Sequence, residues 1–170
     1  MYEIEITDRQ SQFPLDTSRL IQVAETLLNA ESVKSATISL TFVDDSEIHQ
    51  INRNFLQHDY PTDVISFLLN QRQDLPQPES IPRGIDQQIE GEVIVSTETA
   101  VRECQNYDWP PEQETILYVI HGLLHLAGYD DLSDAERLIM RQREQDILLE
   151  CGIEIPKTNM DEPPGESSDY

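Results

Sequence analysis

The chain has 170 residues, of which 38% are hydrophobic, and a formal net charge of −22 at pH 7. This length suits a single domain with a sizeable core, and no apolar run approaches the roughly 20 residues that a membrane span needs. The negative charge excludes nucleic-acid binding through an overall positive surface, so any such site has to be a local basic patch. The two cysteines show no CxxC spacing and the N-terminus does not resemble a signal peptide, which together favour the cytoplasm.

The first part of the chain predicts a strand, a helix and a second strand. Residues 2–7 alternate between apolar and polar side chains, as in a half-buried strand. Asp16 is suited to cap a helix that runs to about Asn29, since the apolar residues there form one stripe. Residues 37–43 alternate again and predict the second strand.

A second helix and a short third strand are expected next. Asp44 and Glu47 have the spacing of a capping box, which predicts a helix that begins there and ends at about Leu56. Its apolar residues are expected to face the core, namely Ile48, Ile51 and Phe55. Residues 62–67 are rich in β-branched side chains and predict a short strand.

The middle of the chain predicts a long loop, a central strand and a helix. Residues 70–88 contain three prolines, five glutamines and no apolar period, so we expect a loop that is either mobile or functional. Residues 91–96 are nearly continuously apolar, which is typical of a strand inside a sheet. Ser96 or Thr97 is expected to cap a helix that ends at about Tyr107.

The last two helices complete the predicted fold. The helix that begins at Pro110 and Pro111 is apolar nearly all round, so we expect it to be the buried central helix. Ser133 and Glu136 form a capping box for a final helix that ends near Glu150. On that helix Arg137 and Arg141 share one face, and we interpret them as solvated or paired with acids such as Glu144.

These elements predict one α/β domain over residues 1–155, with a mixed sheet of about four strands packed with about five helices. Residues 156–170 are acidic, contain Pro, Gly and Ser, and are expected to be a disordered tail. All 11 basic residues precede residue 158, and only four of the 33 acidic ones follow it, so the domain itself remains strongly acidic.

Two of the four histidines lie in the central helix and predict a metal site. His121 and His125 are four residues apart, so their rings lie on one helix face, one turn apart. Gly128 is placed to end the helix in a left-handed cap, and the chain can then return Asp131 as a third ligand. Three protein ligands leave the fourth position of zinc open, as in catalytic sites. The alternative is that both histidines are ordinary core residues with satisfied hydrogen bonds.

The same spacing overlaps the pattern of the metzincin peptidases. Those enzymes need a glutamate directly after the first histidine as the general base, and this chain has Gly122 there. A zinc peptidase is therefore disfavoured.

Three segments together resemble the signature segments of the YbeY family: Thr62-Asp63-Val64-Ile65-Ser66-Phe67, Gly91-Glu92-Val93-Ile94-Val95-Ser96 and the run from His121 to Asp130. The resemblance covers roughly residues 2–155. It implies a zinc-binding α/β domain, related to bacterial metal-dependent endoribonucleases that act in ribosomal RNA maturation. It also implies action on small-subunit ribosomal RNA, a role in ribosome quality control, and the ribosomal RNA, the small subunit and ribosome-associated proteins as partners.

The chain departs from the family pattern at the third ligand. The family usually has a histidine immediately after the Tyr-Asp of the motif, and this chain has Asp131. A carboxylate oxygen still binds zinc. Because it places a negative charge next to the ion, the bound water should be less acidic than in a site with three neutral imidazoles. We therefore expect either a higher working pH or acceptance of harder metals such as Mn²⁺.

The second departure concerns a cation. In the family an arginine stands six residues before the threonine of the TDVxSF segment, and here that position is Leu56. Arg53, one helical turn earlier, or His58 just beyond could supply a positive group, although Arg53 also fits an ordinary solvent-facing position.

The leading hypothesis is a zinc-dependent endoribonuclease that binds one Zn²⁺ and cleaves single-stranded RNA at the 3′ end of the small-subunit ribosomal RNA. Its metal ligands would be His121, His125 and Asp131, and its candidate catalytic residues are His121, Arg53 and Asp63, with Asp130 a further candidate base. No membrane or DNA partner is expected. The alternative is a ribosome-biogenesis adaptor that uses zinc for stability and has little or no nuclease activity.

Overall fold

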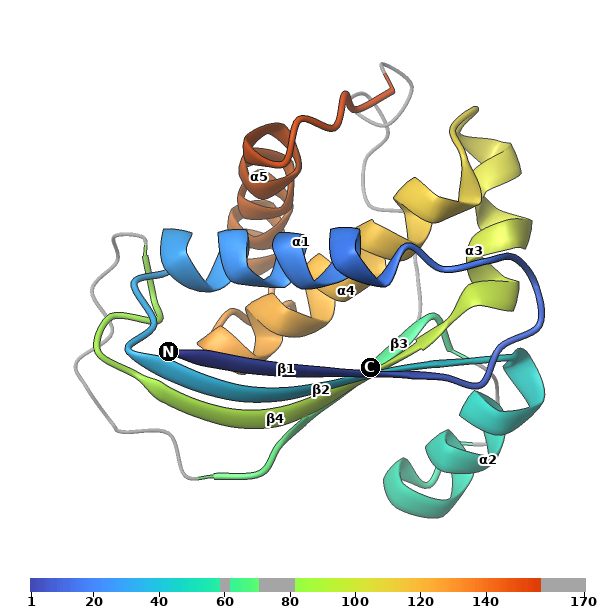
Figure 1. The fold of residues 1–170 in the computed structure, drawn as a ribbon, viewed down its shortest axis with the longest axis horizontal. Helices are drawn as coiled ribbons and strands as arrows, with labels where there is room; N and C mark the ends of the chain where they lie inside the picture. The colour runs from blue at the N-terminus through green and yellow to red at the C-terminus, as the bar shows by residue number, and fades with distance from the viewer. Residues whose placement is uncertain (59–61, 71–81, 157–170) are drawn as a thin grey trace.

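The computed structural model describes residues 1–58, 62–70 and 82–156. Within them the chain forms a single α/β domain with one four-stranded mixed sheet and five α-helices, which confirms the predicted fold class (Figure 1). The strands are β1 (Tyr2–Asp8), β2 (Ser35–Val43), β3 (Val64–Leu68) and β4 (Gln88–Ser96). The helices are α1 (Thr17–Ala30), α2 (Asp45–Leu56), α3 (Thr97–Glu103), α4 (Pro111–Ala127) and α5 (Asp134–Glu150), and a short 3₁₀ helix η1 (Cys104–Asn106) follows α3.

The sheet has the strand order β1-β2-β4-β3. β2 pairs in parallel with both β1 and β4, whereas the edge strand β3 is antiparallel to β4. β4 therefore lies inside the sheet, as its apolar sequence predicts.

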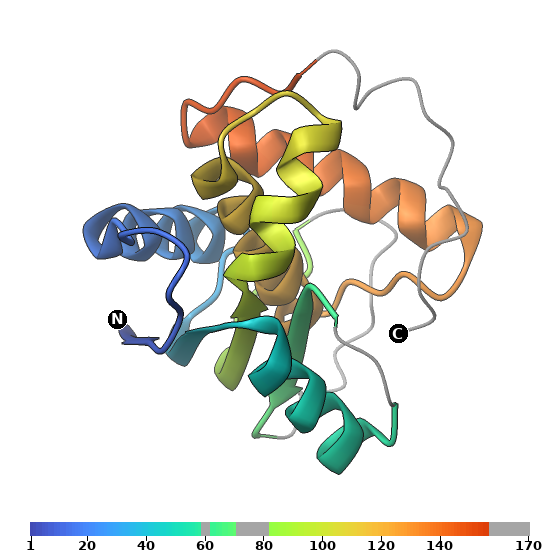
Figure 2. The ribbon, with the colours of Figure 1, turned by 90° about the vertical axis from the view of Figure 1, so that its right-hand side faces the viewer.

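The helices cover the two faces of the sheet unequally. α1, α3, α4 and α5 lie on one face and α2 lies alone on the other (Figures 1 and 2). Because successive side chains of a strand point to opposite faces, Val93 and Val95 of β4 join the large core, whereas Ile94 joins a small cluster with Ile48 of α2. Among the described residues, none of the helices combines the length and the apolar character needed to cross a bilayer.

α4 is the buried central helix, and two glycines let it lie close to the sheet. A Cβ added at Gly122 of α4 would lie 2.5 Å from Cγ1 of Val93 and 3.0 Å from Oγ of Ser66. The Ser66 hydroxyl donates a hydrogen bond of 3.0 Å to the Gly122 carbonyl, so the contact is also polar. A Cβ at Gly91 of β4 would lie 2.7 Å from Cδ1 of Leu126. A larger residue at either position would force the facing side chains to shift.

Most helix starts follow the predicted capping chemistry. Asp16 accepts a hydrogen bond from the Arg19 N–H, and Ser96 and Ser133 cap α3 and α5 in the same way. The capping-box prediction at α2 is wrong. Asp44 occupies the N-cap position, but its carboxylate accepts from the N–H and the hydroxyl of Ser11 in the loop after β1. At the Asp44 carboxylate, donors from a distant loop thus take the place of the first N–H groups of α2.

The prediction that Phe55 faces the core is also wrong. Its side chain is 70% exposed and contacts Phe67 of β3 edge-on, with ring centroids 6.1 Å apart. Ile48 is buried in the small cluster beneath α2 and Ile51 packs against it, whereas Phe55 belongs to neither group and contacts the packed residue Phe67.

Other boundaries shift modestly. The helix predicted to reach Tyr107 changes to 3₁₀ geometry at Cys104, and the loop predicted over 70–88 ends where β4 begins, at Gln88. Residues 71–81 of that loop, and residues 157–170 of the predicted tail, lie outside the described residues.

Gly122→Ala should destabilise the fold. The added methyl group would meet Val93, which is fully buried, so the core has to shift at a typical overpacking cost of about 1–3 kcal/mol. Chemical denaturation of the metal-free protein would measure the loss. Glu25→Ala, at an exposed position of α1, serves as the control and should stay within about 0.5 kcal/mol of wild type. Unchanged or increased stability of Gly122→Ala would contradict the close contact.

Candidate metal centre

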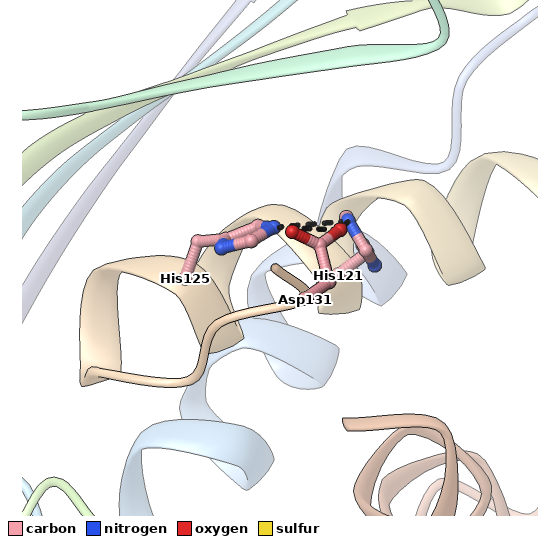
Figure 3. Close-up of side chains that lie close together, drawn as sticks. All are labelled: His121, His125 and Asp131. Carbon is pink, nitrogen blue, oxygen red and sulfur yellow. Dashed lines mark hydrogen bonds and ion pairs between the residues drawn. The ribbon is translucent and has the colours of Figure 1, made fainter. Parts of the chain in front are cut away.

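Three side chains from α4 and the turn after it converge on one point (Figure 3). The Nε2 atoms of His121 and His125 lie 3.1 Å apart. Oδ2 of Asp131 lies 3.7 Å from the first and 3.6 Å from the second. The chain reverses at Gly128, whose left-handed φ of 113° ends α4 as the sequence predicts. The turn brings Asp131 back over the helix face that carries both rings.

The spacing of these donor atoms fits a metal ion. Ligands at tetrahedral corners around zinc, at 2.0–2.1 Å, are separated by roughly 3.3 Å. Both histidine side chains are 25% exposed and that of Asp131 is 22% exposed, so the point between them is reachable from solvent. Within residues 1–58, 62–70 and 82–156 this is the only cluster of histidine, cysteine and carboxylate groups spaced to hold an ion. Three protein donors with access to solvent is the arrangement of a site that keeps a position open for water or substrate.

Each imidazole is oriented by a hydrogen bond at its other nitrogen. Nδ1 of His121 lies 2.6 Å from Oε1 of Glu144 on α5, and Nδ1 of His125 lies 3.1 Å from the main-chain oxygen of Tyr129. A carbonyl and an ionised carboxylate can only accept, so each Nδ1 carries a proton, and each Nε2 would face a bound metal with its lone pair. Such outer partners fix the tautomer and the ring orientation of metal-binding histidines.

The two rings differ in proton affinity. Burial lowers the pKa of His121, but the hydrogen bond and the charge of Glu144 outweigh it, so the net pKa is raised. Burial and the neighbouring His121 lower the pKa of His125. Two cationic rings at this distance repel, so His125 remains neutral and His121 is the ring at which protons compete with a metal at low pH.

Glu144 is the residue that sequence reasoning missed. The sequence predicts that it pairs with arginines on its own helix, and in the structure it contacts His121 on α4. Arg137, which is predicted to be solvated or paired, contacts Asp134 and donates a hydrogen bond of 3.1 Å to the main-chain oxygen of Asp131. The signal available in the sequence was a carboxylate on the helix that follows the histidine motif. The direction of its side chain depends on how α5 packs on α4, which the sequence does not show.

The other predicted residues lie before β3, in the turn after α4 and on α2. Asp63 directly precedes β3, accepts a hydrogen bond of 2.8 Å from the N–H of Val64, and its charge contributes to the raised pKa of His121. Asp130 is exposed in the turn. Arg53 is exposed in the last turn of α2, on the face of the sheet opposite α4, and Leu56 ends that helix with 40% of its surface exposed.

Comparison with known proteins identifies the family. Residues 5–152 match the family described as Endoribonuclease YbeY. The chain belongs to the YbeY family. It is 38% identical over 159 residues to a protein named Endoribonuclease YbeY from Rhodopirellula baltica, covering 91% of this chain and 75% of the relative. A protein of the same name from Syntrophotalea carbinolica is 39% identical over 145 residues, with 83% and 91% covered.

A solved structure shares the fold of this chain. The solution structure of a Thermotoga maritima protein aligns with a TM-score of 0.53, covering 98% of this chain and all of that one. At 23% identity it shows the fold alone. The family resemblance based on the three sequence segments is thus confirmed, and the convergent histidines lie in the longest of them.

Glu144→Gln should weaken zinc binding about 10- to 100-fold, the usual range for loss of an outer carboxylate partner. Glutamine keeps the shape of the side chain but removes the charge that favours the Nδ1–H tautomer of His121. Zinc affinity can be measured by competition with a chromophoric chelator. Glu150→Gln, which removes an equal charge from an exposed position of α5, is the matched control. Equal affinity of both variants would contradict the role of Glu144.

Proposed function

We propose that this chain is a metal-dependent endoribonuclease that cleaves single-stranded RNA in the cytoplasm. Its proposed substrate is the 3′ end of the small-subunit ribosomal RNA, and its proposed setting is ribosomal RNA maturation and ribosome quality control, with the small subunit and ribosome-associated proteins as partners. The observation that carries the proposal is the convergence of His121, His125 and Asp131, with donor atoms 3.1–3.7 Å apart, in the motif typical of the YbeY family. We extend the proposed domain over residues 1–155.

One Zn²⁺ would be held by His121, His125 and Asp131. A divalent ion in such a site polarises a phosphoryl oxygen and lowers the pKa of bound water. Glu144 and the Tyr129 carbonyl hold the two imidazoles with their Nε2 lone pairs toward the shared point. Asp131 adds one negative charge to the donor set, which supports use at a higher pH or with Mn²⁺.

Asp63 is our candidate for the general base. It directly precedes β3, which packs against α4, and its charge contributes to the raised pKa of His121. In this proposal it accepts a proton from the attacking water while His121 stays at the metal. Two donors hold one of its oxygens in place, the N–H of Val64 and the hydroxyl of Thr62 at 3.3 Å.

Positive charge for the RNA backbone is the weaker part of the arrangement. Arg53 would contact a phosphate of the RNA from the last turn of α2, where it is exposed. Leu56 occupies the position at which the family typically has an arginine. Fewer cationic groups than in the family pattern are therefore available to stabilise the charge that develops at the scissile phosphate.

The alternative function is a ribosome-biogenesis adaptor that binds zinc for stability and cleaves little or no RNA. The net charge of −22 and the exposed Leu56 favour it, because both weaken attraction to a phosphate backbone. Measured cleavage separates the two functions.

His121→Ala should abolish RNA cleavage, reducing the rate about 100-fold or more, because a metal ligand is lost. The zinc-loaded protein would be incubated with a ribosomal RNA fragment that contains the single-stranded 3′ end of the small-subunit RNA. His49→Ala, which removes a histidine from α2, is the matched control and should cleave like wild type. Equal background cleavage by wild type and His121→Ala would favour the adaptor.

Leu56→Arg should increase cleavage about 10-fold or more by restoring a cation that can face the RNA. Asn54→Arg adds the same charge to the same exposed turn of α2 and controls for general attraction of RNA. Rates at saturating RNA separate a gain in chemistry from tighter binding. The same gain in both variants would show that position 56 has no special role.

A further inference from the structure

A buried carboxylate lies directly after α1, far from the metal centre in the sequence. The side chain of Glu31 is fully buried. Its Oε2 accepts hydrogen bonds of 2.9 Å from the Tyr129 hydroxyl and 3.0 Å from the N–H of Arg83, and its Oε1 accepts from Nε of Arg143. Burying a charge is unfavourable unless it is paired and hydrogen-bonded, and here three donors satisfy it.

One of these donors belongs to the metal turn. Tyr129 is 2% exposed, and the guanidinium of Arg83 lies 4.8 Å from the centre of its ring. The main-chain N–H of Tyr129 donates a hydrogen bond of 3.0 Å to the Leu124 carbonyl in the last turn of α4. Its own carbonyl is the acceptor that lies 3.1 Å from Nδ1 of His125. Tyr129 therefore joins Glu31 at its hydroxyl to His125 at its main chain.

We propose that Glu31 is a positioning residue for the metal centre and acts through Tyr129. The hydroxyl bond holds the tyrosine in place, so its carbonyl keeps the His125 ring in the orientation that directs Nε2 toward His121. The same anchor holds the start of the segment that carries Asp131 two residues later. Glu31 thus aligns two of the three donors without touching either. The inference rests on the proposed metal-binding function.

A purely structural role is the competing explanation, because the same network joins α1 to α5. Nη2 of Arg143 donates a hydrogen bond of 3.0 Å to the Ala30 carbonyl, next to its contact with Glu31. Loss of such a link lowers stability whether or not a metal binds. A positioning role has to appear in metal affinity and in the geometry of the bound ion.

Tyr129→Phe is the primary variant, with Tyr2→Phe as its matched control. Tyr129→Phe removes only the hydroxyl that Glu31 accepts from and keeps the ring beside Arg83. Tyr2→Phe removes a hydroxyl that donates 2.8 Å to the Val33 carbonyl, close to Glu31 in the chain but outside the metal turn. Tyr129→Phe loses a buried bond to a charged carboxylate and Tyr2→Phe a half-buried bond to a neutral carbonyl, so the metal-free melting temperature should fall more in Tyr129→Phe.

The two variants should differ in metal binding. We expect Tyr129→Phe to weaken Zn²⁺ binding about 10-fold, as removal of outer-shell support does, and to alter the visible absorption spectrum of bound Co²⁺. Tyr2→Phe should leave the Zn²⁺ dissociation constant within about twofold of wild type and the Co²⁺ spectrum unchanged. Glu31→Gln should weaken binding at least as much as Tyr129→Phe, and combining the two should add little further loss.

The inference fails if Tyr129→Phe binds Zn²⁺ within twofold of wild type with an unchanged Co²⁺ spectrum, whatever its stability. It also fails if Tyr2→Phe weakens binding equally, since the effect would then follow general stability. Failure of the proposed function looks different. In that case wild type itself would bind Zn²⁺ no better than His121→Ala, and neither tyrosine substitution would change the affinity further.

Discussion

The direct contact between α4 and the sheet at Gly122 is the constraint on which the metal centre depends. A side chain at this position would collide with Val93, so the helix backbone lies on β3 and β4 with no room to shift. Once that face is fixed, His121 and His125 turn toward a side of the helix that stays partly open. The same contact explains the missing peptidase base: position 122 faces the sheet, so a glutamate there would meet the core and could not serve the metal centre.

The centre is then supported from several elements through carboxylates and their partners. Glu144 reaches His121 from α5, and Glu31 reaches Tyr129 from the end of α1. Arginines near the centre serve this internal network, since Arg143 pairs with Glu31 and Arg137 donates to the Asp131 carbonyl. In this acidic protein carboxylates therefore orient an imidazole and the turn, and the neighbouring arginines pair with carboxylates and main-chain oxygens of the fold.

Local patterns predicted the elements well where short-range physics decides them. The caps at Asp16 and Ser133 and the left-handed Gly128 are set by neighbouring backbone groups and are confirmed. The prediction at Asp44 failed because Ser11, 33 residues away, supplies competing donors. The prediction that Phe55 faces the core failed because periodicity defines an apolar stripe on α2 but does not show which of its residues the opposing layer covers.

The sequence by itself determined the donor set of the candidate site and the family. His121, His125 and the turn to Asp131 follow from helical spacing and one glycine, because all three come from a single continuous segment. Only the tertiary structure decided what surrounds them. Glu144, Glu31 and Asp63 lie on other elements, 23, 90 and 58 residues from His121 in the chain. Glu144 contacts His121 and Glu31 contacts Tyr129 because of how α1 and α5 pack around α4, and no local period encodes that packing.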